Sequence, residues 1–111
     1  DRAAMGARIC RDVNSPACRM LFDLFHEQMQ VGNVDSLDDP KVWECIESFH
    51  IADVPGRNEP GSGTMPYAQI FKKIWDKGFR GFLGMEHGQS VKTLEMDEKI
   101  LATYRSFDAQ V

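Results

Sequence analysis

Apolar residues recur along the chain at two alternating spacings, which predict helices and strands in turn. Residues 2–13 place apolar side chains every four positions on one face, as a helix does. That helix should end before Pro16, because proline disfavours helical geometry in the residue that precedes it. Residues 19–25 (RMLFDLF) are a short apolar run around one aspartate, which is typical of a buried strand.

The middle of the chain predicts a short helix, a second strand and a long loop. Residues 32–39 are polar, and Asp39 with Pro40 has the pattern of a helix cap followed by a proline at the first helical position. Residues 48–54 (SFHIADV) form the second predicted strand, and residues 55–65 hold two prolines and three glycines. The apolar stripe expected for the short helix is Val42, Trp43 and Ile46.

The last third contains the clearest helical pattern. Pro66 opens a stretch with apolar residues at i, i+3, i+4, i+7 and i+8, and Gly78 ends it. Residues 79–86 (FRGFLGME) are predicted as a third strand, and Ser90 is expected to cap a final helix.

The predicted order is therefore α-β-α-β-α-β-α, with about three parallel strands and four helices in an α/β fold. Three strands are too few to close a barrel, which takes eight strands and about 250 residues. The pattern alone leaves two architectures open. One is a small flavodoxin-like domain, and the other is a part of a (β/α)₈ barrel.

The amino-acid composition argues against some classes of binding partner and indicates a cellular compartment. The net charge of −4 argues against a broad nucleic-acid or acidic-membrane surface, which needs clustered Lys and Arg. No apolar run reaches the ~18 residues of a transmembrane helix. Three cysteines without a CxxC spacing favour buried thiols in a reducing, cytoplasmic compartment. The chain opens without an initiator methionine, so we expect sequence upstream of it.

Each predicted strand ends in a side chain that can bind a metal: Asp23, His50 and Glu86. Groups at the carboxyl ends of parallel strands converge on one edge of a sheet, and in a (β/α)₈ barrel that edge holds the active site. Carboxylates and imidazoles together suit Mg²⁺, Mn²⁺ or Co²⁺, and also Zn²⁺. A further polar residue follows each of them within three positions: His26, Asp53 and His87.

Each of these residues also has an ordinary structural explanation. An aspartate at a strand end often caps the next helix, and a histidine there is often a hydrogen-bonded structural residue. We interpret His87 as a partly exposed loop residue. Arg57 could offer two parallel hydrogen bonds to a carboxylate or phosphate, but a surface salt bridge is its more usual role. A shared metal site and separate structural roles both remain open from spacing alone.

Three segments carry a resemblance to a known family: LFDLFH, HIADVPGRNEPGSG and PYAQIFKKIWDKGFRGFLGMEH. They resemble hydroxypyruvate isomerases of the xylose-isomerase-like family over about residues 14–100. The resemblance implies that residues 1–111 form the C-terminal part of a (β/α)₈ TIM barrel, with strands six to eight and their flanking helices. It also implies a second catalytic glutamate on an earlier strand, so the isolated chain should be incomplete and inactive.

The resemblance further implies roles for individual residues. Asp23, His50 and Glu86 match metal-ligand positions, Glu86 matches a catalytic carboxylate, and His26 and Arg57 match positions that hold substrate oxygens. The implied enzyme is an aldose-ketose type isomerase of carbohydrate metabolism. It would convert hydroxypyruvate to tartronate semialdehyde by proton transfer through a metal-stabilised enediolate. The implied partner is a small hydroxy-carbonyl substrate, without nucleic acid or membrane. The oligomeric state of the full protein stays open, and a homo-oligomer is one option.

Two departures from the family pattern keep other activities open. Hydroxypyruvate isomerases tend to carry glutamine where this chain has His50, whereas the epimerases carry histidine, and an acid tends to stand in place of Thr64. A ketohexose 3-epimerase or another sugar isomerase on the same barrel is therefore an alternative. Two further alternatives are apurinic endonuclease chemistry and a fragment without catalytic activity.

Overall fold

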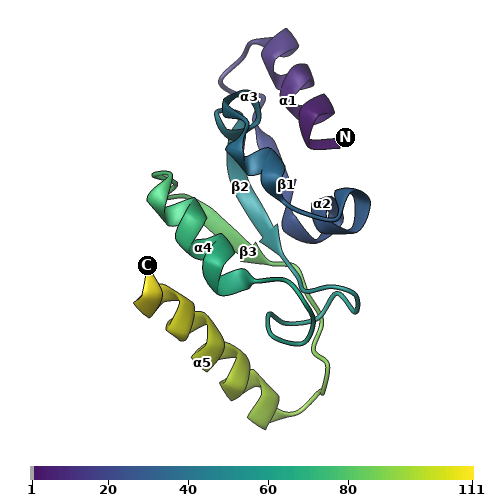
Figure 1. Ribbon diagram of the computed structural model, residues 1–111, viewed down its shortest axis with the longest axis vertical. Helices are drawn as coiled ribbons and strands as arrows, with labels where there is room; N and C mark the ends of the chain where they lie inside the picture. Colours follow the sequence, from purple (N-terminus) through teal and green to yellow (C-terminus); the bar gives the residue numbers. More distant parts are fainter. Residues whose placement is uncertain (1) are drawn as a thin grey trace. The chain divides into compact units, whose positions relative to one another are not determined.

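The computed structural model describes residues 2–111, which contain three strands, five α-helices and one 3₁₀ helix (Figure 1). None of these helices is both long and apolar enough to cross a membrane, and the longest, α5, has 17 residues. In chain order the elements are α1 (Arg2–Val13), β1 (Met20–Asp23), α2 (Leu24–Val31), η1 (Asp35–Asp38), α3 (Pro40–Trp43), β2 (Ile46–Ile51), α4 (Tyr67–Asp76), β3 (Phe82–Met85) and α5 (Leu94–Gln110).

The three strands form one parallel sheet in the order β1-β2-β3, as the alternating pattern predicts (Figure 1). Asp23 of β1 pairs with His50 of β2, and His50 pairs with Gly84 of β3. These three residues therefore form one row across the sheet. Because side chains alternate along each strand, the row points to a single face of the sheet.

The chain divides into two compact units, which we describe separately. The sheet unit contains the chain up to Ile51 together with Gly81–Met85, and so includes the three strands and helices α1 to α3. The loop-helix unit contains Ala52–Arg80 and Glu86–Val111, and so includes α4, α5 and the long loop that follows β2.

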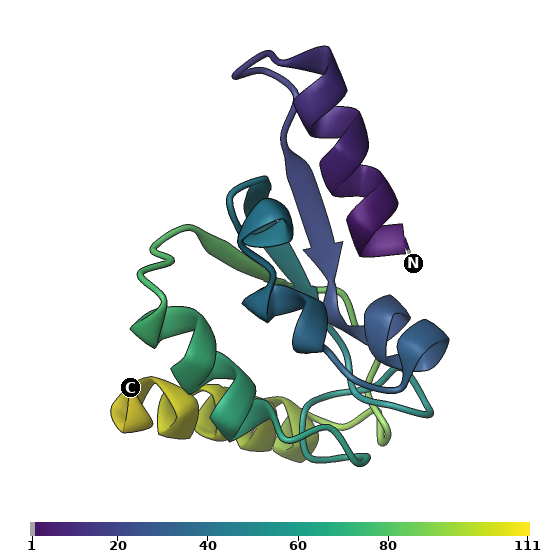
Figure 2. The ribbon, with the colours of Figure 1, turned by 45° about the horizontal axis from the view of Figure 1, so that its top comes forward.

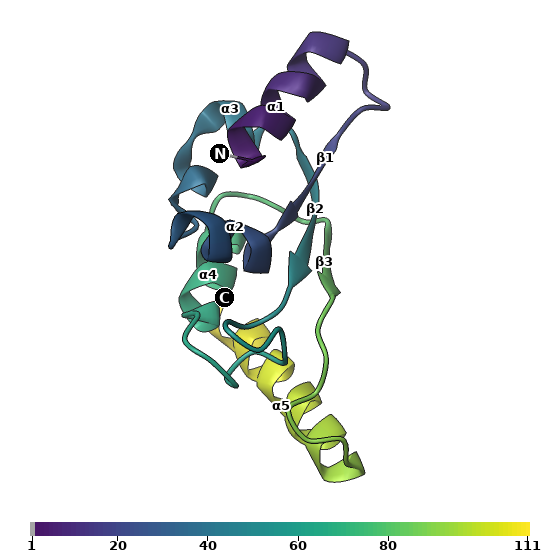
Figure 3. The same cartoon turned by 90° about the vertical axis from the view of Figure 1, so that its right-hand side faces the viewer.

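One face of the sheet is covered by helices and the other is open. Figure 3 shows the sheet unit with α2 and α3 on the same side of the strands. Phe22 and Phe49 point to the covered face, where their rings lie 5.8 Å apart, and Phe49 is fully buried. Phe82 is 83% exposed on the opposite face. By strand alternation Asp23 and His50 belong to that open face.

The loop-helix unit has its own core, built where α4 packs against α5 (Figure 2). The ring of Phe71 lies 4.9 Å from that of Phe107 and 6.3 Å from that of Tyr104. The buried apolar side chains of this unit are Ala52, Val54, Met65, Tyr67, Ile70, Ile74 and Ile100. The helical spacing of α4 is confirmed as a buried stripe for Tyr67, Ile70 and Ile74, whereas Trp75 at the end of the pattern is 43% exposed.

The largest difference from the sequence prediction is helix α2, which brings the α-helices to five instead of four. Residues 19–25 were expected to be one strand, but β1 ends at Asp23 and α2 begins at Leu24. Leu24 and Phe25 are buried as the first turn of that helix. An apolar run without clear period does not distinguish a strand from a buried helix, which explains the error.

Other helix and strand boundaries also differ from the sequence prediction. Ile46 opens β2 instead of completing the stripe of α3, and β2 ends at Ile51, before the expected end at residue 54. Strand β3 is shorter than residues 79–86, so Glu86 lies just beyond it. Thr93, and not Ser90, caps α5, because the Thr93 hydroxyl accepts a hydrogen bond from the Met96 amide.

Candidate active site

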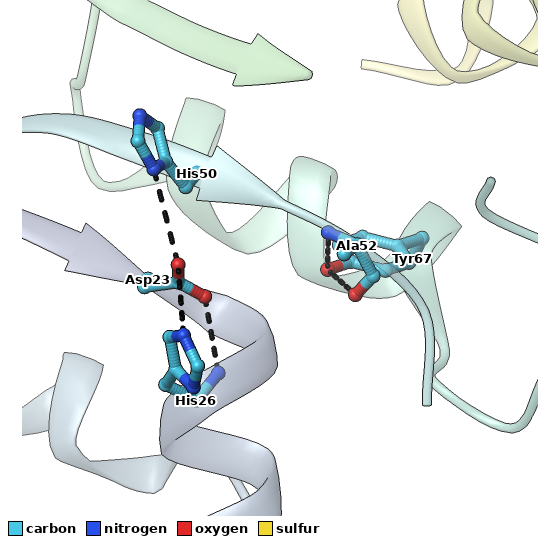
Figure 4. Close-up of polar contacts among 5 residues, drawn as sticks. All are labelled: Asp23, His26, His50, Ala52 and Tyr67. Carbon is cyan, nitrogen blue, oxygen red and sulfur yellow. Dashed lines mark hydrogen bonds and ion pairs between the residues drawn. The ribbon is translucent and has the colours of Figure 1, made fainter. Parts of the chain in front are cut away.

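Asp23 stands at the carboxyl end of β1 and has two functions there (Figure 4). Its Oδ1 accepts a hydrogen bond of 3.0 Å from the backbone amide of His26, so the side chain caps helix α2. Its Oδ2 lies 3.9 Å from Nε2 of His26 and 3.8 Å from Nδ1 of His50. One carboxylate therefore starts a helix and faces two imidazoles.

His50 reaches Asp23 from the neighbouring strand (Figure 4). The paired residue on β3 is Gly84, and a Cβ added there would lie in ordinary van der Waals contact, 3.4 Å from the imidazole Cδ2. The His50 side chain is 32% exposed and that of Asp23 is 17% exposed. Both side chains are therefore partly accessible to solvent.

The spacing of these two groups fits two ligands of one divalent ion. Metal–ligand bonds of about 2.0–2.2 Å place neighbouring ligand atoms about 3 to 3.5 Å apart. The observed 3.8 Å between Asp23 Oδ2 and His50 Nδ1 is close to that range. Within residues 2–111 the structure shows no group of three or more His, Cys, Asp or Glu side chains placed to hold a metal. Two of the three predicted ligands are therefore brought together.

Glu86, the third predicted ligand, belongs to the loop-helix unit and is exposed. It directly follows Met85, the last residue of β3. Its assignment as a ligand stays a prediction, as do the roles of His26 and Arg57 in substrate binding. His26 is exposed on the first turn of α2 beside Asp23, and Arg57 is exposed in the long loop.

Asp53 organises the loop that follows β2. Its side chain is fully buried, and its two oxygens accept four backbone hydrogen bonds of 2.8–3.1 Å, from the amides of Val54, Gly61, Gly63 and Met65. Because these bonds occupy both oxygens, Asp53 is a structural residue and not a metal ligand. The loop closes so tightly that a Cβ on Gly63 would lie 1.7 Å from the carbonyl oxygen of Val54.

Tyr67 fixes the start of the same loop from helix α4 (Figure 4). Its hydroxyl donates a hydrogen bond of 2.7 Å to the carbonyl oxygen of Ala52 and accepts one of 3.2 Å from the Ala52 amide. Both peptide groups of Ala52 are thereby satisfied inside the protein. Ala52, two positions after His50, is thus hydrogen-bonded to helix α4.

Arg57 sits at the tip of this loop in a left-handed backbone conformation, with φ of 59°. Its amide donates to the Asp53 carbonyl oxygen at 2.9 Å, and its own carbonyl oxygen accepts from the Gly88 amide at 3.0 Å. A non-glycine residue with positive φ costs about 1 kcal/mol, so the surrounding bonds must hold it there. Arg57 is therefore presented from a fixed backbone.

Glu59 links the loop to the segment after β3. It is buried, and its carboxylate accepts hydrogen bonds from both the Ser90 hydroxyl and, at 2.9 Å, the Ser90 amide. Burial alone would raise the pKa of Glu59, but the hydrogen bonds from Ser90 outweigh burial and hold this pKa below its usual value. Together with the bond from Gly88 to Arg57, this contact joins residues 57–59 to residues 88–90.

His87 is partly exposed in the segment after β3, as expected. Its Nε2 shares a hydrogen bond of 2.7 Å with the hydroxyl of Tyr104, on which the ring also stacks. Burial raises the pKa of Tyr104, and the charge of Glu59 raises it further, so the phenol remains protonated near neutral pH. His87 therefore anchors its segment to α5.

Sequence reasoning missed the residues that build this framework. The sequence pattern indicates only a loop position for Glu59 and a helix-stripe position for Tyr67. It predicts that Ser90 caps α5. Asp53 was noted solely for its position after His50. The one available signal was the concentration of glycine and proline in residues 55–65, which predicts tight turns but not which carboxylate collects their amides.

These features define an α/β protein of parallel strands joined by helices, with titratable groups at the carboxyl ends of adjacent strands. That is the layout of (β/α)₈-barrel enzymes. The model of the xylose isomerase-like TIM barrel family matches residues 1–105, and the chain belongs to this family.

Curated relatives include several isomerases. A Drosophila melanogaster protein named "Putative hydroxypyruvate isomerase" is 37% identical over 91 residues, which cover 80% of this chain and 34% of that protein. The 2-oxo-tetronate isomerase of Haemophilus influenzae is 36% identical over 80 residues, covering 69% of this chain and 31% of the enzyme. The chain thus spans about a third of the length of these relatives.

Solved structures agree on the fold. The 3-keto-D-glucoside 4-epimerase YcjR of Escherichia coli superposes with a TM-score of 0.82 at 22% identity, covering 94% of this chain and 39% of that one. An AP endonuclease of family 2 from Brucella melitensis gives a TM-score of 0.73 at 31% identity, covering 86% of this chain and 35% of that one. The chain therefore has the fold of part of this barrel.

The buried carboxylate of Asp53 should be essential to the long loop. In Asp53→Asn the amide nitrogen replaces one acceptor and meets backbone N–H groups, so we expect the free energy of unfolding to fall by about 3 kcal/mol. Urea denaturation measures this, and hydrogen exchange should show faster exchange at the Gly61 and Gly63 amides. Asp108→Asn, at an exposed position of α5, should change stability by less than about 0.5 kcal/mol. Equal effects of the two substitutions would contradict the role of Asp53.

Glu59 should make the stability depend on pH in the acid range. Because its pKa is lower in the folded protein, the ionised carboxylate stabilises the fold above the unfolded-state pKa of about 4.3. This contribution is lost as the pH falls through the lower, folded-state pKa. The drop in unfolding free energy from about pH 6 to about pH 3 should therefore be smaller in Glu59→Gln than in the unmodified protein. Glu98→Gln, at an exposed site on α5, should leave that drop unchanged, and a Glu59→Gln profile that matches it would refute this assignment.

Proposed function

We propose that this chain supplies part of the active site of a divalent-metal-dependent isomerase that acts on small hydroxy-carbonyl compounds, most like a hydroxypyruvate isomerase. The observation that carries the proposal is the pairing of Asp23 with His50 at the carboxyl ends of adjacent parallel strands. The isomerase names of the relatives support the reaction class. The proposal also includes a cytoplasmic location, homo-oligomers of the full protein, and a site completed by residues outside this chain.

The donor set suits Mg²⁺, Mn²⁺ or Co²⁺, with Zn²⁺ as a further candidate. Asp23 and His50 would hold the ion, together with Glu86, which is one peptide bond beyond the end of β3. When bound, such an ion supplies Lewis-acid polarisation of a carbonyl and its neighbouring hydroxyl. Asp23 offers its Oδ2 for this purpose, because its Oδ1 is engaged in capping α2.

Side chains of this chain would transfer the proton and orient the substrate. Glu86 would accept the proton from the carbon next to the carbonyl or return it to the neighbouring carbon, as a general base and acid. His26, whose ring is exposed beside Asp23, would donate a hydrogen bond to a substrate oxygen. Arg57 would bind the substrate carboxylate with its two parallel N–H donors, from a backbone fixed by Asp53 and Gly88. The product from hydroxypyruvate would be tartronate semialdehyde.

Two residues favour a second substrate class. His50 is the residue that ketohexose epimerases tend to carry, and the chain has Thr64 where hydroxypyruvate isomerases tend to have an acid. A ketohexose 3-epimerase would use the same metal ligands and the same proton transfer. Parallel assays with hydroxypyruvate and with ketohexoses distinguish the two activities.

Nucleic-acid cleavage is the least supported activity. One similar structure bears the name of an AP endonuclease, but this chain carries a net charge of −4, with 13 basic and 17 acidic residues. Binding to DNA relies on clustered Lys and Arg that neutralise phosphates. Cleavage of abasic DNA by the purified protein would reverse this conclusion.

Replacement of Glu86 tests the proposed proton transfer. Glu86→Gln keeps the size of the side chain but removes its basicity, so we expect kcat for hydroxypyruvate to fall by about 10²- to 10⁴-fold. The measurement is isomerase turnover by the full protein saturated with Mn²⁺. Glu98→Gln should retain full activity. Undiminished turnover by Glu86→Gln would eliminate Glu86 as the catalytic carboxylate.

Replacement of Asp23 tests metal binding independently of catalysis. Asparagine caps a helix as well as aspartate does, so Asp23→Asn should keep α2 intact while it removes the charged ligand. We expect the Kd for Mn²⁺ by isothermal titration calorimetry to rise by about 100-fold or more. Asp39→Asn, the matching substitution at the cap of α3, should bind Mn²⁺ normally. An unchanged Kd for Asp23→Asn would exclude this metal site.

A further inference from the structure

All three cysteines of the chain lie together at the end of the sheet opposite to Asp23 and His50. Cys10 is in the last turn of α1, Cys18 precedes β1, and Cys45 directly precedes β2. They line one surface pocket of about 340 Å³. This clustering was not expected from the sequence, which separates the first and last of them by more than thirty residues.

Local hydrogen bonds fold the chain back so that Cys18 meets Cys10. The Asn14 amide donates to the Cys10 carbonyl oxygen at 3.0 Å, and Asn14 leaves the helix with φ of 50°. The Cys18 amide then donates to the carbonyl oxygen of Ser15 at 3.0 Å. Cys10 and Cys18 line the same pocket, and both residues are partly exposed.

Cys45 has a different environment from the other two. It is buried, and its Sγ donates a hydrogen bond to the carbonyl oxygen of Lys41 at 3.4 Å and lies 3.7 Å from that of Ala7. A buried thiol that is held by backbone carbonyls behaves as a small core residue. Cys45 thus provides a built-in comparison for the exposed pair.

We propose that Cys10 and Cys18 are a redox-active dithiol, which low-molecular-weight disulfides oxidise to an intramolecular Cys10–Cys18 disulfide. Cys10 and Cys18 flank one hydrogen-bonded turn and line the same pocket, so a disulfide between them would close a short loop. Both thiols are partly exposed at this pocket, where a small disulfide can reach them.

The reaction proceeds in two thiol–disulfide exchanges. The Cys18 thiolate attacks one sulfur of the small disulfide, forms a mixed disulfide and releases one small thiolate. Cys10 then loses its proton, its sulfur attacks the Cys18 sulfur, and the second small thiolate leaves. Overall, two protein thiols are oxidised and one small disulfide is reduced to two thiols. Burial raises the pKa of Cys10, and the neighbouring Cys18 raises it further, which favours Cys10 as the second thiol to react.

Peptide mapping tests this proposal directly. Trypsin cleaves after arginine, so it places Cys10 in residues 9–11 and Cys18 in residues 12–19. After the purified protein is incubated with oxidised glutathione and digested without reductant, mass spectrometry should find these two peptides linked and two hydrogen atoms lighter than their sum. Reduction with dithiothreitol should separate them. No activity assay is involved, so the result is independent of the proposed isomerase function.

Cysteine variants distinguish the Cys10–Cys18 disulfide from other products of oxidation. Cys10→Ser should stop at a glutathione mixed disulfide on Cys18, and Cys18→Ser should form no linked pair. Cys45→Ser and Cys45→Ala should both form the linked pair as readily as the unmodified protein. Absence of the linked peptides under excess oxidised glutathione, or preferential linkage of either cysteine to Cys45, would overturn the proposal.

Discussion

The buried carboxylate of Asp53 is the interaction on which the long loop depends. A loop of this composition has many backbone amides and few side chains to pack, and burying its amides without acceptors would be costly. Asp53 supplies two oxygens that collect four of them at once. Since the Arg57 amide bonds to the carbonyl oxygen of the same aspartate, one residue determines both the path of the loop and the position of its arginine.

A second constraint acts within the sheet. Parallel pairing places Asp23 beside His50, and Gly84 of β3 is the next residue in the same row. The helices cover the opposite face, so the row of polar groups is on the face that stays accessible. Backbone register, and not a local motif, thus brings these two side chains together from positions that are distant in the sequence.

The sequence predicted the parallel α/β arrangement because short apolar runs at β2 and β3 alternate with the helical period of α4, and glycine and proline separate them. It predicted wrongly where β1 ends, because a strand and a buried helix turn share the apolar run around Asp23. The approach of Asp23 to His50 followed from strand-end positions alone. The roles of Asp53, Glu59 and Tyr67 could not be predicted, because each depends on which backbone groups the folded loop brings to it.

The two oxygens of Asp23 have a consequence for ligand recognition. The bond from Oδ1 to the start of α2 fixes the rotamer of the side chain before any ligand arrives. A carboxylate that is already immobilised loses little rotational freedom on binding, so more of its attraction for a cation is retained as affinity. The first turn of α2 therefore restrains the side chain of Asp23. Any motion that unfolds this turn would also free the carboxylate to change rotamer.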